Sequence, residues 1–209
     1  MYSNFENLSE DKKRTILEAC IHEFAEKGYE NSSTNTIVKE AGISKGILFH
    51  YFKNKKGLFL YVVDYCIRTI VEEYNKYPLV ETGDIFQRLS ELSVIKLKLT
   101  HANLEMSKML MGAIGNSPED IRSEVESRYS ELSSEYMPAI FQKVDYSKFR
   151  SGVNPLKAIE ILMLFLEALG DKYIKNYQGK EQDLLQNYDK LTEEYNEYME
   201  ILKHGMYSS

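Results

Sequence analysis

This sequence of 209 residues is poor in the residues that cross-link or interrupt a chain, with no tryptophan, two cysteines and four prolines. Cys20 and Cys66 are too few for the disulfide framework of a small secreted domain, and we expect them to be buried apolar groups. The longest apolar run, Ile161 to Leu166, has six residues, whereas a transmembrane helix needs about 20. The first residues hold no apolar run that would suggest a signal peptide. A cytoplasmic protein is therefore predicted.

Positive charge is also scarce, since 26 lysines and arginines stand against 32 acidic residues and leave a net charge of -6. One segment reverses this balance. Between Ser33 and Leu60 the chain has five lysines and a single acid, Glu40, so this stretch carries +4 and the remainder carries -10. Cationic charge gathered in one segment is typical of a surface that binds phosphates. The distribution indicates a nucleic-acid partner in spite of the acidic average.

Strand patterns are absent as well, and nearly every segment has apolar side chains at the spacing of a helix. Residues that favour helix N-caps, prolines at first helical positions and glycines at ends set the boundaries. The sequence predicts an all-α fold of about nine helices. They are expected from Ser9 to Gly28, Thr34 to about Ala41, Ser44 to about Tyr51, Asn54 to just before Pro78, Asp84 to about Leu99, Asn103 to Ile114, Ser117 to a kink or break at Pro138, Asn154 to Gly179, and Lys180 to His204.

The most informative stretch is Thr34 to Lys53, TNTIVKEAGISKGILFHYFK. Two short helices joined at Gly42 form a helix-turn-helix, whose second helix enters the major groove of DNA. Apolar residues can lock the two helices together, namely Ile37, Ala41, Ile43 and Leu48. Four residues are left near the exposed start of the second helix, namely Lys45, Gly46, Phe49 and His50. Thr34 and Ser44 lie at helix N-termini, where the helix dipole favours a phosphate.

At these residues the sequence resembles the TetR (tetracycline repressor) family of transcriptional regulators, over about Ser9 to Tyr65. The resemblance rests on AGISKG at 41–46, HYFK at 50–53 and NKKGLF at 54–59. It implies an N-terminal helix-turn-helix DNA-binding domain, here residues 1–53, and a helical effector-binding and dimerisation domain, residues 54–209. It also implies base or phosphate contacts from Thr34, Lys45, Gly46, Phe49, His50, Tyr51 and Lys55.

One position departs from the family. Many members have tyrosine where this chain has Phe49, which can contact a thymine methyl group but cannot donate a hydrogen bond to a phosphate. Of the next two aromatic residues, we assign Tyr51 to the DNA side of the helix and Phe52 to the core.

The helix from Leu156 to Tyr177 is apolar on more than one face, so it must be buried on all sides, centrally in the chain or at a two-fold interface. The resemblance suggests that this helix and the last one pair with their copies in a four-helix bundle. The interface is predicted at Leu162, Phe165, Leu166, Leu169, Tyr188, Leu191 and Tyr195. A homodimer also suits a pseudo-palindromic double-stranded operator.

The resemblance places a small-molecule effector site in the middle helices, about residues 84–150. Methionine and aromatic side chains suit an adaptable pocket for an apolar or amphipathic compound. The residues expected there are Met106, Met109, Tyr129, Met137 and Phe141. The same spacing also fits an ordinary core.

Motifs for catalysis fail on their context. Gly42 to Gly46 matches G-x-S-x-G, but the hydrolase motif needs a preceding strand. His22-Glu23 would begin a zinc-protease motif, but position 26 is Glu. No enzyme, cofactor or metal site is predicted. The expected function is a sequence-specific transcriptional regulator, a repressor that an effector releases from its operator. Activation remains open, as do an architectural DNA-binding protein without effector and a helical enzyme or scaffold that does not bind DNA.

Overall fold

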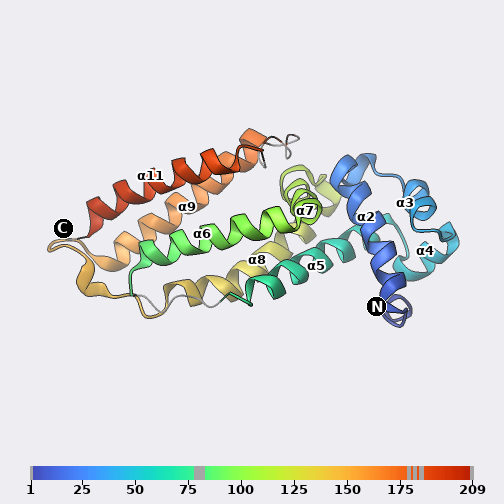
Figure 1. The fold of residues 1–209 in the computed structure, drawn as a ribbon, viewed down its shortest axis with the longest axis horizontal. Coiled ribbons are helices and arrows are strands. Elements are labelled where there is room, and N and C mark those ends of the chain that lie inside the picture. Colours follow the sequence, from blue (N-terminus) through green and yellow to red (C-terminus); the bar gives the residue numbers. More distant parts are fainter. Residues whose placement is uncertain (1, 78–82, 178–179, 181–182, 184–185, 208–209) are drawn as a thin grey trace. The chain divides into compact units, whose positions relative to one another are not determined.

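The computed structural model of this chain describes residues 2–77, 83–177, 180, 183 and 186–207. These residues form helices, and within them the only extended pairing is an isolated bridge between Phe149 and Tyr207. The all-α prediction is confirmed. The elements, labelled in Figure 1, are α1 Ser3–Glu6, α2 Glu10–Asn31, α3 Thr34–Glu40, α4 Lys45–Phe52, α5 Lys55–Tyr74, α6 Ile85–Ala102, α7 Leu104–Asn116, α8 Glu119–Phe141, the 3-10 turn Tyr146–Lys148, α9 Pro155–Tyr177 and α11 Tyr188–Met206.

Side-chain caps account for several of the helix starts. The hydroxyl of Ser44 accepts the amide of Ile47, so the predicted cap of α4 is confirmed. Ahead of α5, the side chain of Asn54 accepts a hydrogen bond from the amide of Gly57 at 2.8 Å. The side chain of Asn154 accepts hydrogen bonds from amides in the first turn of α9. For α3 the prediction was one residue late, because the cap is Ser33 and Thr34 is the first helical residue. A serine therefore caps each helix of the helix-turn-helix, since its hydroxyl satisfies an amide that has no partner within the helix.

Of three predicted helix ends, the one at Gly28 is confirmed as a kink, and the other two differ from the structure. At Gly28 the backbone turns to φ 65°, ψ -177°, a conformation open essentially to glycine alone, and α2 then resumes as far as Asn31. α8 continues past Pro138 and ends at Phe141, so the helix does not break at the proline. α11 passes Gly205 to Met206, because Met206 and Tyr207 are buried and their packing outweighs the small helical cost of glycine.

The first helix, α1, was not predicted. Phe5 is completely buried, with its ring centroid 4.8 Å from that of Phe52 and 5.3 Å from that of Tyr61. One buried aromatic side chain thus fixes the N-terminal residues against the helices that follow in sequence.

The chain divides into two compact units, residues 1–72 with 103–130, and residues 73–102 with 131–209. In the first unit, α7 packs along α2, so a segment from beyond residue 100 completes the N-terminal core. This core buries Phe52, as predicted, and both cysteines, which are free thiols. The predicted boundary at residue 53 separates a DNA-binding domain from an effector-binding domain. It divides the chain by function and not by packing, and it stays a prediction.

The second unit has its own core, in which α6, α9 and α11 contribute Ile85, Leu162 and Met199 among others. This corrects part of the predicted dimer interface. Leu162 is 1% exposed and Leu169 is 7% exposed in the single chain, so neither is available to a partner. Phe165, Leu166, Leu191 and Tyr195 are half-buried, and the side chain of Tyr188 lies outside the described residues. Among the helices described, none is long and apolar enough to span a membrane.

Candidate nucleic-acid interface

α3 and α4 form the helix-turn-helix through a short turn at Gly42, whose φ is 65°. The amide of Ile43 donates to the carbonyl of Val38 at 3.0 Å and closes the turn. Ile37 of α3 and Leu48 of α4 are completely buried in the core of the first unit. Ala41 is buried in the same core, so the burial of all three residues agrees with the predicted packing. The turn therefore holds α4 in one orientation relative to α3.

α4 has one buried face and one exposed face. Leu48 and Phe52, four residues apart, point into the core. Lys45, Gly46 and His50 are exposed, which leaves them accessible to a partner.

Ile47 is 43% exposed on α4, although it is a large apolar residue. Ile47 is a candidate contact that was not predicted from the sequence. Its position could have been found from the inner residue Leu48, because a helix turns about 100° per residue and a direct neighbour cannot share the same face.

Phe49 and Tyr51 lie at the edges of the exposed face, and both are half-buried. The ammonium of Lys45 is 5.9 Å from the centroid of the Phe49 ring. The Tyr51 ring packs edge-on against Phe5, with centroids 5.7 Å apart. Tyr51 thus packs α4 against Phe5 of α1, and the DNA contacts of Phe49 and Tyr51 stay predictions.

His50 has a partner from the N-terminal helix. Its Nε2 atom lies 2.9 Å from Nδ2 of Asn4 in α1. α1 and α4 therefore meet at the exposed face, and the amide of Asn4 orients the imidazole that was predicted to contact DNA.

Lys55 has a structural role in addition to the predicted phosphate contact. Its Nζ donates to the carbonyls of Glu30 at 3.0 Å and Ser32 at 2.7 Å, and it lies 5.1 Å from the centroid of the Tyr29 ring. Partial burial lowers the pKa of this lysine, although the nearby Glu23 and Glu30 act in the opposite direction. An ammonium has three N–H groups, so two hold the end of α2 and one is left for a phosphate.

Glu23 acts on the same junction from the other side. It is 7% exposed, and its Oε1 accepts the amide of Ser33 at 2.7 Å. Because Ser33 is the cap of α3, a buried carboxylate and a half-buried ammonium together fix the point where the helix-turn-helix begins.

The lysines of this segment differ in their availability. Lys56 pairs with Glu124 at 2.6 Å and donates to the carbonyl of Asp120. Lys39, Lys45 and Lys53 are exposed and form no ion pair with any described residue. The helix-turn-helix unit therefore has cations that can meet phosphates without first breaking an ion pair with a described residue.

The residues predicted for the effector pocket are not brought together within one unit. Met106, Met109 and Tyr129 belong to the first core, where Met109 is 1% exposed and the Tyr129 hydroxyl donates to the carbonyl of Leu110. Phe141 packs against the second core, and the side chain of Met137 lies outside the described residues. For Met109 the packing fits the alternative of an ordinary core. No cluster of three or more potential metal ligands occurs among the described residues.

Comparison with known proteins agrees with this geometry. Residues 16–62 match the family described as bacterial regulatory proteins, tetR family, and this range includes both helices of the helix-turn-helix. The chain belongs to the tetR family. As a tetR-family member, it is a DNA-binding transcriptional regulator.

The similarity to individual tetR-family proteins extends beyond the helix-turn-helix. The chain is 27% identical to the HTH-type transcriptional repressor AcnR of Corynebacterium efficiens, over 78% of this chain and 80% of AcnR. It is 23% identical to IcaR of Staphylococcus aureus, the negative regulator of the biofilm operon icaADBC, over 75% of this chain and 81% of IcaR.

Among solved structures, a TetR family transcriptional regulator from Chloroflexus aurantiacus is similar with a TM-score of 0.62 and 20% identity. The similarity covers 99% of this chain and 98% of the chain from Chloroflexus aurantiacus. A transcriptional regulator from Aquifex aeolicus has a TM-score of 0.63 and 21% identity, with 91% and 99% covered. These two likenesses concern the fold.

Proposed function

We propose that this tetR-family protein is a cytoplasmic repressor that binds a pseudo-palindromic operator as a homodimer and is released by a small-molecule effector. The observation that carries the DNA-binding part is the exposed face of α4, where Lys45, Gly46 and His50 stand opposite the buried Leu48 and Phe52. The relatives AcnR and IcaR, a repressor and a negative regulator by name, support repression over activation.

On this proposal, α4 lies in the major groove and its side chains make different kinds of contact with the DNA. Lys45 and His50 hydrogen-bond to base edges, and Ile47 and Phe49 contact thymine methyl groups. Gly46 lets the helix backbone come close to the DNA. Phosphates are held by Tyr51 and Lys55 and by the N-terminal turns of the two short helices, which begin at Thr34 and after Ser44.

The homodimer is supported by apolar surface on the second unit. α9 leaves four large apolar side chains exposed and α11 leaves one, namely Leu156, Ile161, Met163, Leu164 and Ile201. The two helices are joined to each other, since the Phe165 and Tyr198 rings are 5.4 Å apart and Lys172 pairs with Glu194 at 2.8 Å. Exposed apolar patches of this kind mark interaction sites. We place the interface on this face, together with the half-buried Phe165, Leu166, Leu191 and Tyr195.

The effector part of the proposal rests on the family. We propose that residues 54–209 bind an apolar or amphipathic compound that changes the spacing of the two α4 helices. Met106 and Tyr129, which both pack against the core of the first unit, remain the proposed lining.

Operator selection from random duplex DNA with the purified protein tests the function. We expect one enriched pseudo-palindrome, whose base preference changes in Lys45→Ala and His50→Ala. Lys190→Ala, which removes an exposed lysine from α11, is the control and should select the same sequence. Repeating the selected binding reaction with cell extract tests release by an effector. Binding without a discrete operator would favour an architectural protein, and no binding even at low salt would overturn the proposal.

A further inference from the structure

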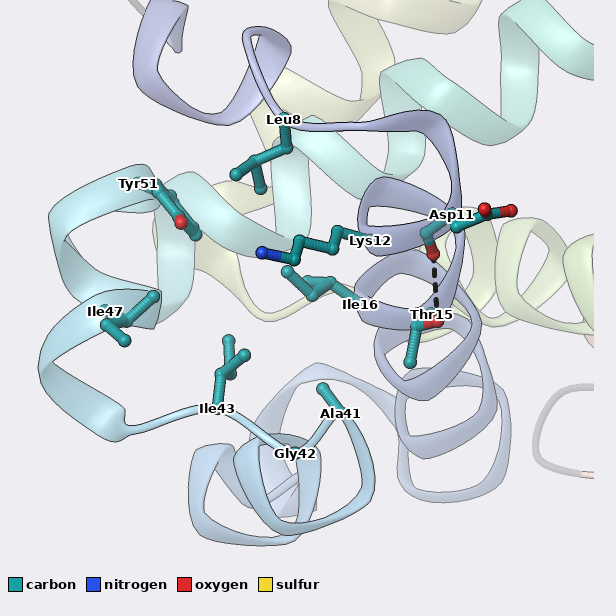
Figure 2. A pocket seen from close by; sticks show the side chains of 10 residues that line it. All are labelled: Leu8, Asp11, Lys12, Thr15, Ile16, Ala41, Gly42, Ile43, Ile47 and Tyr51. Atoms are coloured by element: carbon teal, nitrogen blue, oxygen red, sulfur yellow. Dashed lines mark hydrogen bonds between the residues drawn. The ribbon is translucent and has the colours of Figure 1, made fainter.

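A groove of about 380 Å³ lies beside α4 in the first unit. Its walls come from the N-terminal turns of α2, from the turn at Gly42 and from the side of α4 that carries Ile47 and Tyr51 (Figure 2). Lys12 and Thr15 line it from α2. The groove is therefore continuous with the proposed DNA-reading surface, because Ile47 and Tyr51 belong to both.

The start of α2 has three consecutive cations, of which only Lys12 lines the groove, and the other two are paired with carboxylates. Lys13 pairs with Glu10 at 2.6 Å, and Arg14 pairs with Asp11 at 2.8 Å. Lys12 is exposed and has no ion-pair partner among the residues that the structure describes. Its side chain extends along the groove toward Tyr51 (Figure 2). The groove thus holds an uncompensated ammonium.

The remaining polar groups of the groove fit a single anion. Thr15 uses its hydroxyl to donate to the carbonyl of Asp11 at 2.9 Å. The carboxylate of Asp11 itself is balanced by Arg14, so it adds no net charge. Lys12 and the hydroxyl of Tyr51 are left as donors. The apolar wall at Ile47 suits the sugar that accompanies a backbone phosphate.

We infer that this groove binds one phosphate of the operator backbone, with Lys12 and the Tyr51 hydroxyl as its donors. The start of α2 then belongs to the DNA interface, outside the helix-turn-helix. The inference rests on the proposed function, because the groove meets a backbone phosphate only when the adjacent α4 lies in the major groove.

The test is operator binding by Lys12→Gln, measured by fluorescence anisotropy over a range of salt concentrations. Each phosphate neutralised on duplex DNA contributes about 0.9 to the slope of log K against log salt. Loss of one contact should therefore weaken binding about tenfold at roughly 0.1 M salt and flatten the slope by about 1. Tyr51→Phe removes a neutral donor, so it should weaken binding several-fold and leave the slope unchanged.

Lys98→Gln is the matched control, because it removes the same charge from an exposed position on α6 in the second unit. It should keep the wild-type affinity and slope, and all three variants should unfold at the wild-type temperature. If Lys12→Gln binds the operator with unchanged affinity and slope, the inference is overturned and the proposed function stands. If the wild-type protein selects no operator, both are overturned.

Discussion

At the scale of single residues, Gly46 has no role that the fold alone explains. It lies in the first turn of α4, and a Cβ atom built there would meet only the Ser44 hydroxyl oxygen, at 3.9 Å. The protein thus has room for alanine, which is more favourable in a helix by up to about 1 kcal/mol. Close approach of a partner to the α4 backbone is the reason for glycine that is consistent with the proposed function.

Gly46→Ala should therefore separate stability from binding. We expect the free energy of unfolding to rise by about 0.5–1 kcal/mol, measured by urea denaturation. Operator affinity should fall, because the added methyl group lies between α4 and the DNA. Gly112→Ala, at a position in α7 where an added Cβ meets nothing within 4 Å, should gain similar stability and keep its affinity. Unchanged operator affinity in Gly46→Ala would remove Gly46 from the interface.

At the scale of elements, the junction of α2, α3 and α5 determines where the helix-turn-helix begins. Lys55 donates to two carbonyls at the end of α2, and Glu23 accepts the amide of Ser33 at the start of α3. Lys55 belongs to α5 and Glu23 to α2, so both of these helices contribute to the junction. A change at Lys55 should therefore affect the fold as well as the DNA contact.

Lys55→Met keeps the length of the side chain and removes the charge. We expect the free energy of unfolding to fall by about 1–2 kcal/mol, because two hydrogen bonds from a charged donor are lost. The salt slope of operator binding should also flatten by about 1 through the lost phosphate contact. Lys45→Met provides the comparison, since Lys45 is exposed on α4 and should affect binding alone. Equal stability of the two variants would show that the carbonyl contacts do not hold the junction.

The elements also explain what the sequence could predict. Caps such as Ser44, Asn54 and Asn154 were found because a cap and the amide it accepts lie within three residues. α1 was missed because Phe5 is buried by aromatic residues more than 40 positions away along the chain. Contacts between distant segments leave no periodic signal in the sequence.

The same limit applied to the second unit. α9 is apolar around most of its circumference, so its sequence could not distinguish the face that packs inside from the face that stays open. Leu162 and Leu164 are two residues apart, yet one is 1% exposed and the other 60%. Only the packing of α6 and α11 against α9 decides between them.

At the scale of the whole molecule, the proposed function needs two copies of the chain. Two half-sites are read together only if two α4 helices are linked, and linkage converts the second binding event into an intramolecular one. The exposed apolar side chains of α9 and α11, among them Ile161, Leu164 and Ile201, are the surface that we propose for this link. Two-fold symmetry brings the same residues of both copies to one interface.

Leu164→Glu tests that link, because two-fold symmetry would place a carboxylate of each copy in an apolar interface, where an unpaired charge is costly. By light scattering at micromolar concentration, we expect the wild type at twice its chain mass of 24.3 kDa and the variant at the single mass. Operator affinity should fall by about 10²-fold, since the half-sites would be bound separately. Leu104→Glu, at a leucine that is 47% exposed at the start of α7, should remain dimeric. A Leu164→Glu protein that stays dimeric would place the interface on another surface. A monomeric wild type would contradict the proposal that one homodimer binds both half-sites of the operator.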